Sequence, residues 1–252
     1  MKKTFLLKTF LLLSLLVLIS DSVFAQRARV LDRVQEKIDS CFIASFNAPN
    51  AYDDLERNIM AGYKSEKSSN IKSYYLYWLS YLTYYKSVSA FKESDMENSQ
   101  KYVEQAMNYL EEIGNKDSEY YSLLAYEQVF YFQFVKRQDM FIFMDKLSKS
   151  LKLAMELGAS NPRAFFVNGY YDYYTPKEYG GKKKTEELLL KAINLNNSPR
   201  PFAPTWGVAD SYSLLIQYYL ENGDKAKANA MFLQAIKLFP TSQDILRLKK
   251  QL

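Results

Sequence analysis

Residue types that carry out most enzyme chemistry are scarce in this sequence. It has no histidine and a single cysteine, Cys41, among 252 residues. Ser-His-Asp and Cys-His catalysis, zinc sites built on imidazole and intrachain disulfides are therefore excluded. Adjacent carboxylates such as Asp53 with Asp54, and Glu186 with Glu187, are neighbours on predicted helices and so do not face each other. The sequence therefore predicts a protein that is not an enzyme and that uses no metal and no cofactor.

Tyrosine is the most unusual feature of the composition, with 22 residues. One cluster lies at residues 74–85 and a second lies at residues 170–179. A tyrosine ring can fill the space between stacked helices while its hydroxyl reaches water or a carbonyl group. An exposed ring can instead anchor a partner at low cost in conformational entropy. We expect the first cluster to pack, whereas packing and binding both stay open for the second.

Residues 180–185, with the sequence GGKKKT, place Lys182, Lys183 and Lys184 before a predicted helix. A phosphate-binding loop needs a glycine, four further residues and then Gly-Lys-Ser or Gly-Lys-Thr after a strand, and this segment does not match. A helix N-terminus carries partial positive charge, so an anionic partner would stabilise three lysines there. In the alternative interpretation the lysines are solvated, and Glu186 and Glu187 supply the favourable negative charge.

Apolar residues recur three and four positions apart from residue 30 almost to residue 252, and no stretch sustains an apolar-polar alternation. This periodicity predicts an all-helical protein, and turn-forming residues divide it into eleven helices. Repeated helix pairs of about 34 to 45 residues indicate an α-solenoid, in which each pair buries its apolar face against its neighbours. Five antiparallel pairs are expected: 26–46 with 49–63, 71–91 with 94–113, 118–137 with 140–157, 162–174 with 185–195, and 205–222 with 224–239.

The last pair contains the clearest motif, at residues 209–240. Its elements are large residues in the first helix (Tyr212, Leu215, Tyr219), a Gly223-Asp224 turn, a small-large-small set in the second helix (Ala228, Phe232, Ala235) and the closing Pro240. Ala228 and Ala235 are seven residues apart on one helical face, which lets a neighbouring backbone approach. This segment closely resembles the tetratricopeptide repeat (TPR), with Ile216 in place of the family's usual small residue.

Weaker copies of the motif precede it, notably at residues 162–192. The resemblance implies that residues 26–252 form a single TPR-like domain. The last segment, residues 242–252, has Ile245, Leu248 and Leu252 on one face, as expected of a helix that caps the open end of a solenoid.

In tetratricopeptide proteins the inward side of each first helix lines a concave groove. The resemblance implies that the groove of this chain presents aromatic and polar side chains from two helices. They are Arg163, Phe166, Tyr170 and Tyr173 from the first helix, and Asp210, Ser213 and Gln217 from the second. Such a surface suits an extended peptide, a partner helix, or a small aromatic or sugar-like ligand.

Residues 1–25 have the pattern of a cleavable signal peptide: lysines at the start, an apolar run at residues 9–20 and small residues at 23–25. The apolar run is shorter than a membrane span, so we expect no stable membrane insertion after cleavage. Cleavage would remove three lysines and one aspartate from 33 basic and 28 acidic residues, which leaves a net charge near +3. This near-neutral balance argues against a nucleic-acid partner. The expected location is the bacterial periplasm or the exterior.

The sequence thus favours an exported scaffold that binds a protein or peptide partner of the cell envelope in its concave groove. The alternative is a periplasmic small-molecule-binding protein that assists an uptake system. An open groove would indicate a protein partner, whereas an enclosed pocket of roughly 300 to 1,000 Å³ would indicate a small ligand.

Overall fold

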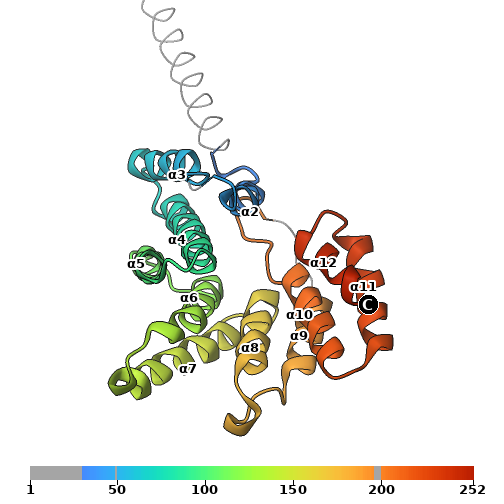
Figure 1. Cartoon of the computed structure of the whole chain (residues 1–252). Coiled ribbons are helices and arrows are strands. Elements are labelled where there is room, and N and C mark those ends of the chain that lie inside the picture. The colour runs from blue at the N-terminus through green and yellow to red at the C-terminus, as the bar shows by residue number, and fades with distance from the viewer. Residues whose placement is uncertain (1–29, 49, 196–199) are drawn as a thin grey trace, which may run out of the picture.

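The computed structural model describes residues 30–48, 50–195 and 200–252, and the regular structure within these ranges is entirely helical (Figure 1). The predicted all-α solenoid is therefore confirmed at the level of secondary structure. The predicted signal peptide, residues 1–25, lies outside the described residues. Within them, no helix has both the length and the apolarity that crossing a bilayer requires.

Eleven α-helices occur in the described residues, as the sequence predicts. They are α2 (Val34–Ser45), α3 (Asp53–Ser65), α4 (Ser69–Lys92), α5 (Met96–Glu111), α6 (Ser118–Tyr131), α7 (Met140–Glu156), α8 (Pro162–Tyr174), α9 (Thr185–Asn194), α10 (Val208–Glu221), α11 (Lys225–Leu238) and α12 (Gln243–Leu248). Short 3-10 turns join or extend several of them: η1 (Phe132–Phe134), η2 (Arg137–Asp139), η3 (Lys177–Tyr179) and η4 (Lys249–Gln251).

Four of the five predicted pairs are present, because α4 packs on α5, α6 on α7, α8 on α9, and α10 on α11. The first predicted pair is less distinct than the others, since α2 and α3 each pack more extensively against α4 than against each other. The physical reason is the composition of α4, which buries residues around most of its circumference and so offers a separate apolar side to each neighbour.

Side-chain caps explain why several helices begin where they do. Asp95 accepts a hydrogen bond from Asn98 N at the start of α5, and Asp224 accepts one from Lys227 N at the start of α11. Asp117 and Asn161 cap α6 and α8 in the same way. Each cap satisfies an amide that the helix itself leaves unpaired, so these boundaries follow from local sequence.

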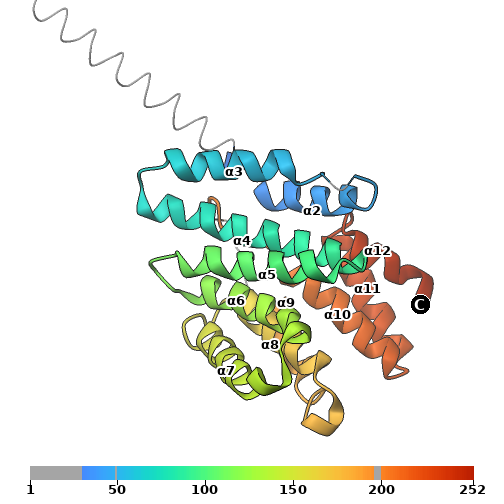
Figure 2. The same ribbon diagram turned by 60° about the vertical axis from the view of Figure 1, so that its left-hand side comes forward.

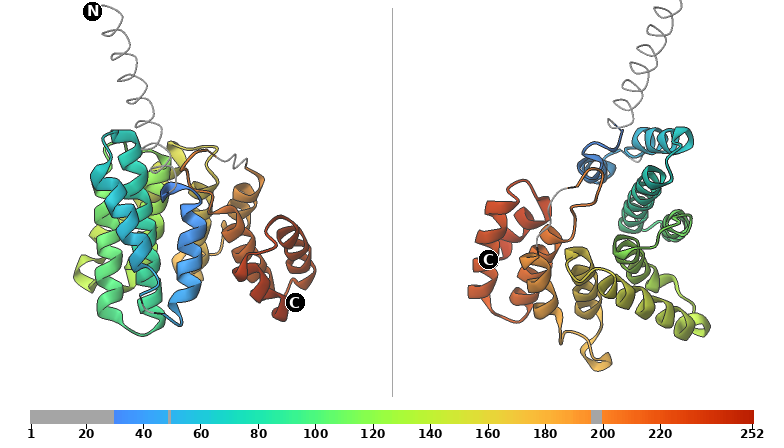
Figure 3. Two further views of the ribbon diagram at one scale, coloured as in Figure 1. Left: turned by 90° about the horizontal axis from the view of Figure 1, so that it is seen from above. Right: turned by 180° about the vertical axis from the view of Figure 1, so that it is seen from behind.

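Figures 1 and 3 show the helices curved around a central space, with α4, α6, α8 and α10 on its inner side. Helices α5, α7 and α11 lie outside this ring, and Figure 2 shows the successive layers from the side. We call the surface of α4, α6, α8 and α10 that faces the centre the inner face. At the far end α12 packs on α10 and α11 through the buried Ile245 and Leu248, as expected of a capping helix.

The first tyrosine cluster forms part of the core. Tyr75, Tyr77, Tyr81 and Tyr84 are each at most 5% exposed, so the expectation that this cluster packs is confirmed. The TPR-like motif behaves as its residue sizes predict, because Ala228 and Ala235 are fully buried between neighbouring helices.

Gly207, directly before α10, provides a test of the backbone at the inner face. Its φ of 97° lies where side chains are disfavoured, and a Cβ there would come within 2.9 Å of Arg163 Cγ. We expect Gly207→Ala to destabilise the protein by about 2–4 kcal/mol, since it adds strain and a clash. Gly223→Ala is the matched control, because its φ is also positive but no atom lies within 4 Å of the added Cβ. This control is expected to cost about 1–2 kcal/mol. Urea unfolding followed by circular dichroism measures both, and equal losses would show that the clash with Arg163 adds no cost.

Candidate functional site

The segment of the chain that leads into α10 crosses the inner face (Figure 1), and it begins with a turn in which Ala203 N donates to the carbonyl oxygen of Arg200 at 3.1 Å. We call the residues 200–206 the strap. Its last residue, Trp206, is 3% exposed, and its ring stacks on Tyr81 and Tyr126 with centroid distances of 6.0 and 5.5 Å. The edge of the indole meets Phe166, and Trp206 Nε1 donates a hydrogen bond of 2.8 Å to Tyr77 Oη. One side chain of the strap is thereby held by α4, α6 and α8.

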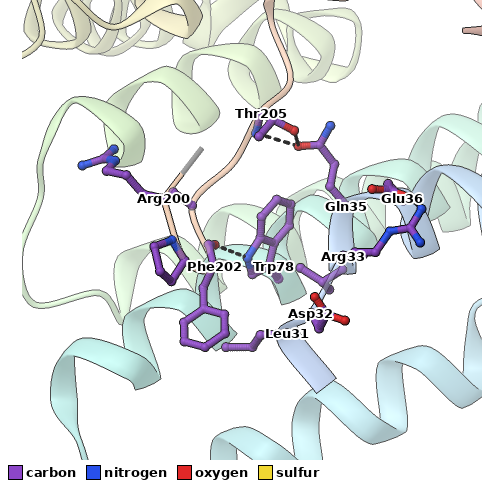
Figure 4. A pocket seen from close by; sticks show the side chains of 12 residues that line it. Leu31, Asp32, Arg33, Gln35, Glu36, Trp78, Arg200, Phe202 and Thr205 are labelled. Atoms are coloured by element: carbon purple, nitrogen blue, oxygen red, sulfur yellow. Dashed lines mark hydrogen bonds and ion pairs between the residues drawn. The ribbon is translucent and has the colours of Figure 1, made fainter. Parts of the chain in front are cut away.

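The protein also binds the main chain of the strap. Gln35 Oε1 accepts hydrogen bonds from the amides of Thr205 and Trp206 at 2.9 and 3.0 Å. On the other edge, Trp78 Nε1 donates to the carbonyl oxygen of Phe202 at 2.9 Å (Figure 4). Side-chain hydrogen bonds to backbone groups combined with a buried aromatic anchor are also the chemistry by which proteins bind peptides. The inner face therefore holds the strap through contacts of the kind that a bound peptide would use.

Arg163 is fixed inside the protein and does not line an open groove. Its Nε and Nη2 donate to the two carboxylate oxygens of Glu119 at 2.5 and 2.6 Å, and Nη1 reaches the carbonyl oxygen of Trp206 at 3.3 Å. Arg163 is 4% exposed. A buried guanidinium needs such a bidentate partner, so its charge is already compensated within the fold.

The other predicted groove residues of α8 are also covered. Phe166 lies against Trp206 and Tyr126, and the hydroxyl of Tyr173 donates to Glu221. Both side chains are buried, at 2% and 6% exposure. The strap and neighbouring side chains thus cover Arg163, Phe166 and Tyr173 in this structure, and their part in binding a partner stays a prediction.

Tyr170 is the predicted groove residue of α8 that keeps some accessible surface. Its ring lies 5.0 Å from that of Tyr126 and 4.6 Å from that of Tyr174, which is 56% exposed. Burial and the neighbouring Tyr174 raise the pKa of Tyr170, so its hydroxyl stays neutral over the physiological range. This hydroxyl can donate or accept a hydrogen bond but carries no charge.

The predicted residues of α10 lie in mixed environments. The carboxylate of Asp210 accepts a hydrogen bond of 2.6 Å from Gly207 N and so helps to begin the helix. Ser213 is 9% exposed, and its Oγ has no hydrogen-bond partner among the described residues. Gln217 is partly buried. Asp210 therefore has a structural task that accounts for its position, whereas Ser213 and Gln217 have none that the contacts reveal.

Asp39 on α2 is a group that the sequence did not single out. Burial, then the charges of Asp210, Asp244 and Glu36, raise its pKa to about 7. These carboxyl groups come from α2, α10 and α12, so their proximity arises only when the two ends of the chain meet. Within the part of the chain that the structure describes, no group of three His, Cys, Asp or Glu residues is arranged to hold a metal ion.

Two pockets flank the strap and share Arg200 and Ala203 in their walls. The larger, of about 540 Å³, lies between the strap and the start of α2 (Figure 4). Its walls are Leu31, Asp32, Arg33, Val34, Gln35, Glu36, Trp78, Arg200, Pro201, Phe202, Ala203 and Thr205. The smaller, of about 460 Å³, is lined by Asn70, Ser73, Tyr74, Tyr77, Ile113, Asn115, Asp117, Glu119, Tyr120, Arg200, Ala203 and Pro204. We call them the α2 pocket and the α6 pocket.

One of the three lysines before α9, Lys182, is paired within the protein. Lys182 Nζ lies 2.8 Å from the carboxylate of Glu221 and over the ring of Tyr173. The start of α9 is held by Asp172, whose carboxylate accepts hydrogen bonds from Lys184 N and Thr185 Oγ1 at 2.9 and 2.6 Å. An acidic side chain of α8 thus occupies the position where an external anion was expected, and anion binding by Lys182, Lys183 and Lys184 stays a prediction.

No family model and no curated protein matches this sequence. Among solved structures, a thermophilic TPR protein from Thermus thermophilus is similar to this chain with a TM-score of 0.52. The similarity covers 86% of this chain and 98% of that one, at 16% sequence identity. The fold is TPR-like. At this level of identity the similarity establishes the architecture alone.

Replacement of Trp206 tests whether this residue anchors the strap. We expect Trp206→Ala to lower the free energy of unfolding by about 3–5 kcal/mol, because it empties a buried aromatic site. Trp206→Phe keeps the stacking and loses the bond to Tyr77, at a cost of about 1–2 kcal/mol. Limited proteolysis measures the local effect, and Trp206→Ala should be cut faster within the strap. Equal cleavage of the wild type and Trp206→Ala would contradict the anchoring role.

The pKa of Asp39 predicts a pH dependence of stability. The folded protein keeps the proton of Asp39 up to a pH of about 7, whereas the unfolded chain releases it near its ordinary value of about 4. The folded state therefore binds more protons between these values, and wild-type stability falls as the pH rises through this range. Asp39→Asn should remove this loss and exceed the wild type above neutral pH by on the order of 1–3 kcal/mol.

Asp95→Asn is the control for this measurement. Hydrogen bonds from Asn98 lower the pKa of Asp95, so its contribution has the opposite sign, and Asp95 is not among the charges that raise the pKa of Asp39. Urea unfolding of both variants between acidic and mildly alkaline pH separates the two effects. A stability difference between wild type and Asp39→Asn that does not change with pH would refute the assignment.

Proposed function

We propose that this protein is an exported, non-enzymatic scaffold that binds a protein or peptide partner of the cell envelope along its inner face. The observation that supports it is the strap, a non-helical segment already bound there through its backbone and one aromatic anchor. Surfaces of TPR-like solenoids suit such contacts, because curved helix arrays present an extended concave face.

The α2 pocket is the place where a partner chain would continue beside the strap. Trp78 and Phe202 form its aromatic wall, and the charges at its edge have both signs (Figure 4). Arg33 pairs with Glu36, and both side chains are more than half exposed. An extended peptide with an apolar side chain between charged residues would match this arrangement in shape and in charge.

The second tyrosine cluster would extend the contact surface. Tyr170 and Tyr174 keep accessible ring surface, and Ser213 and Gln217 of α10 have hydrogen-bonding groups that the fold does not use fully. Arg163, Phe166 and Tyr173 would support this surface from beneath. Lys183 and Lys184, which are exposed, would meet an acidic part of the partner.

Export is part of this proposal and rests on the sequence pattern of residues 1–25. The expected location is the bacterial periplasm or the exterior. The near-neutral charge of residues 26–252 supports a protein partner over a nucleic acid.

A second candidate is a small-molecule-binding accessory component of an uptake system. The volumes of the α2 and α6 pockets, about 540 and 460 Å³, favour it because they lie in the range typical of small-ligand sites. The α6 pocket combines the rings of Tyr74 and Tyr120 with the amides of Asn70 and Asn115. Flat rings and planar amides suit a sugar-like ligand.

A charge reversal at the α2 pocket tests the first candidate. The variant Asp32→Lys/Glu36→Lys changes its edge and leaves Gln35 and the strap contacts in place. Glu93→Lys/Glu97→Lys is the matched control, because it has the same charge change and spacing at exposed positions of the α4–α5 turn. The full chain with a C-terminal tag is recovered from native envelope extract, and bound proteins are quantified by mass spectrometry.

The expected result is a partner that wild type and control recover equally and that the pocket variant recovers at least tenfold less. Direct titration with the purified partner should reproduce this ratio. Equal recovery by all three proteins would contradict the proposed site. A small-molecule adduct in native mass spectra, without any enriched protein, would favour the second candidate.

A further inference from the structure

The end of the α6–α7 hairpin exposes large apolar side chains. Phe141 is 86% exposed and Ile142 is 63% exposed, and Met144 and Phe132 are 42% and 36% exposed. Figure 1 shows this end of the hairpin projecting outward from the ring of helices. We call residues 132–144 the tip. Contiguous exposed apolar groups of this size mark interaction surfaces in folded proteins.

The tip is held rigid by an aromatic cluster beneath it. Phe143 lies 5.5 Å from Tyr131 and 6.2 Å from Phe132 between ring centroids, and Tyr131 lies 5.9 Å from Phe134. Helix α7 buries Leu147, Leu151 and Ala154 on the side that faces its neighbours. The helical period therefore places Phe141 and Ile142 on the opposite, solvent side, where they contribute nothing to the core.

Basic residues surround the exposed apolar side chains. Lys136, Arg137, Lys146 and Lys149 are exposed, and none of these four forms an ion pair with another described residue. Asp139 and Asp145 are the exposed acidic residues of the same stretch, so its net charge is positive. A projecting apolar end with unpaired basic residues behind it matches the charge and polarity profile of an anionic lipid surface.

We propose that the tip inserts Phe141 and Ile142 into the surface of an anionic lipid bilayer while the surrounding lysines and arginine contact the headgroups. The tip is convex, so apolar side chains can enter a fluid phase without a preformed complementary pocket. Long basic side chains can extend to the headgroups from the flanks of the helix. This contact differs from membrane spanning and does not depend on the α2 pocket or on the inner face.

Vesicle co-sedimentation of the full chain tests the proposal, with vesicles of phosphatidylethanolamine and phosphatidylglycerol beside vesicles of phosphatidylcholine alone. The wild type should bind the anionic vesicles and should be released by high salt, since screening weakens the headgroup contacts. Phe141→Ser/Ile142→Ser should lower the partition coefficient at least tenfold, because two apolar side chains no longer leave water. Lys146→Gln/Lys149→Gln should lower it on anionic vesicles, by roughly fivefold for each lysine removed.

Leu233→Ser/Leu238→Ser on α11 is the matched control, because these side chains are also exposed, at 67% and 59%, but lie away from the tip. Intact mass shows whether residues 1–25 are present, and any contribution from them is common to all variants. Circular dichroism and urea unfolding should be unchanged in the tip variant, since the replaced side chains lie outside the core.

Three results would overturn the proposal. They are absence of binding to anionic vesicles, equal binding by the wild type and Phe141→Ser/Ile142→Ser, and a concentration-dependent dimer that the tip variant abolishes. The last result would assign the tip to a second copy of the chain. Asp32→Lys/Glu36→Lys and its charge-matched control Glu93→Lys/Glu97→Lys should bind anionic vesicles equally, so failure at the inner face and failure at the tip are distinguishable.

Discussion

The position of Trp206 determines the character of the inner face. Solenoids bury apolar surface between successive repeats and commonly leave the concave side solvated. Here the indole fills the centre of that side, in contact with rings from α4, α6 and α8, and draws the strap across it. The α2 and α6 pockets are lined in part by the strap residues that precede this anchor.

Polar contacts hold the strap on the inner face in addition to the ring of Trp206. Arg163 Nη1 donates to the carbonyl oxygen of Trp206, and Gln35 Oε1 accepts from the amides of Thr205 and Trp206, so both side chains satisfy backbone groups of the strap. Buried charges and unpaired backbone groups are costly, so these side chains must be present wherever the strap is bound. Arg163 and Phe166, which the family resemblance assigned to a partner-binding groove, therefore contact the strap of the same chain. An external peptide bound at this face would need equivalent hydrogen-bond partners for its backbone groups.

Two surfaces of contrasting chemistry result from this arrangement. The inner face combines aromatic rings with hydrogen-bonding groups and charges of both signs, which suits recognition of a defined ligand. The α6–α7 tip combines exposed apolar side chains with unpaired basic residues and offers no concavity. The inner face would discriminate between ligands by their shape and hydrogen-bonding groups. The tip would favour an apolar phase with a negatively charged surface. A protein could use both together, holding a partner close to a lipid surface.

Helical periodicity, turn-forming residues and the small residues Ala228 and Ala235 predicted the α-solenoid, because these signals act over one or two helical turns. The burial of the first tyrosine cluster was predictable for the same reason. The contacts at the inner face were not predictable from the sequence. Trp206 meets Tyr77 across 129 positions and Gln35 meets the amide of Trp206 across 171, and no local pattern specifies such contacts. The family resemblance placed Arg163 and Phe166 on the correct side of α8, but their burial was decided by a distant segment that competes for the same space.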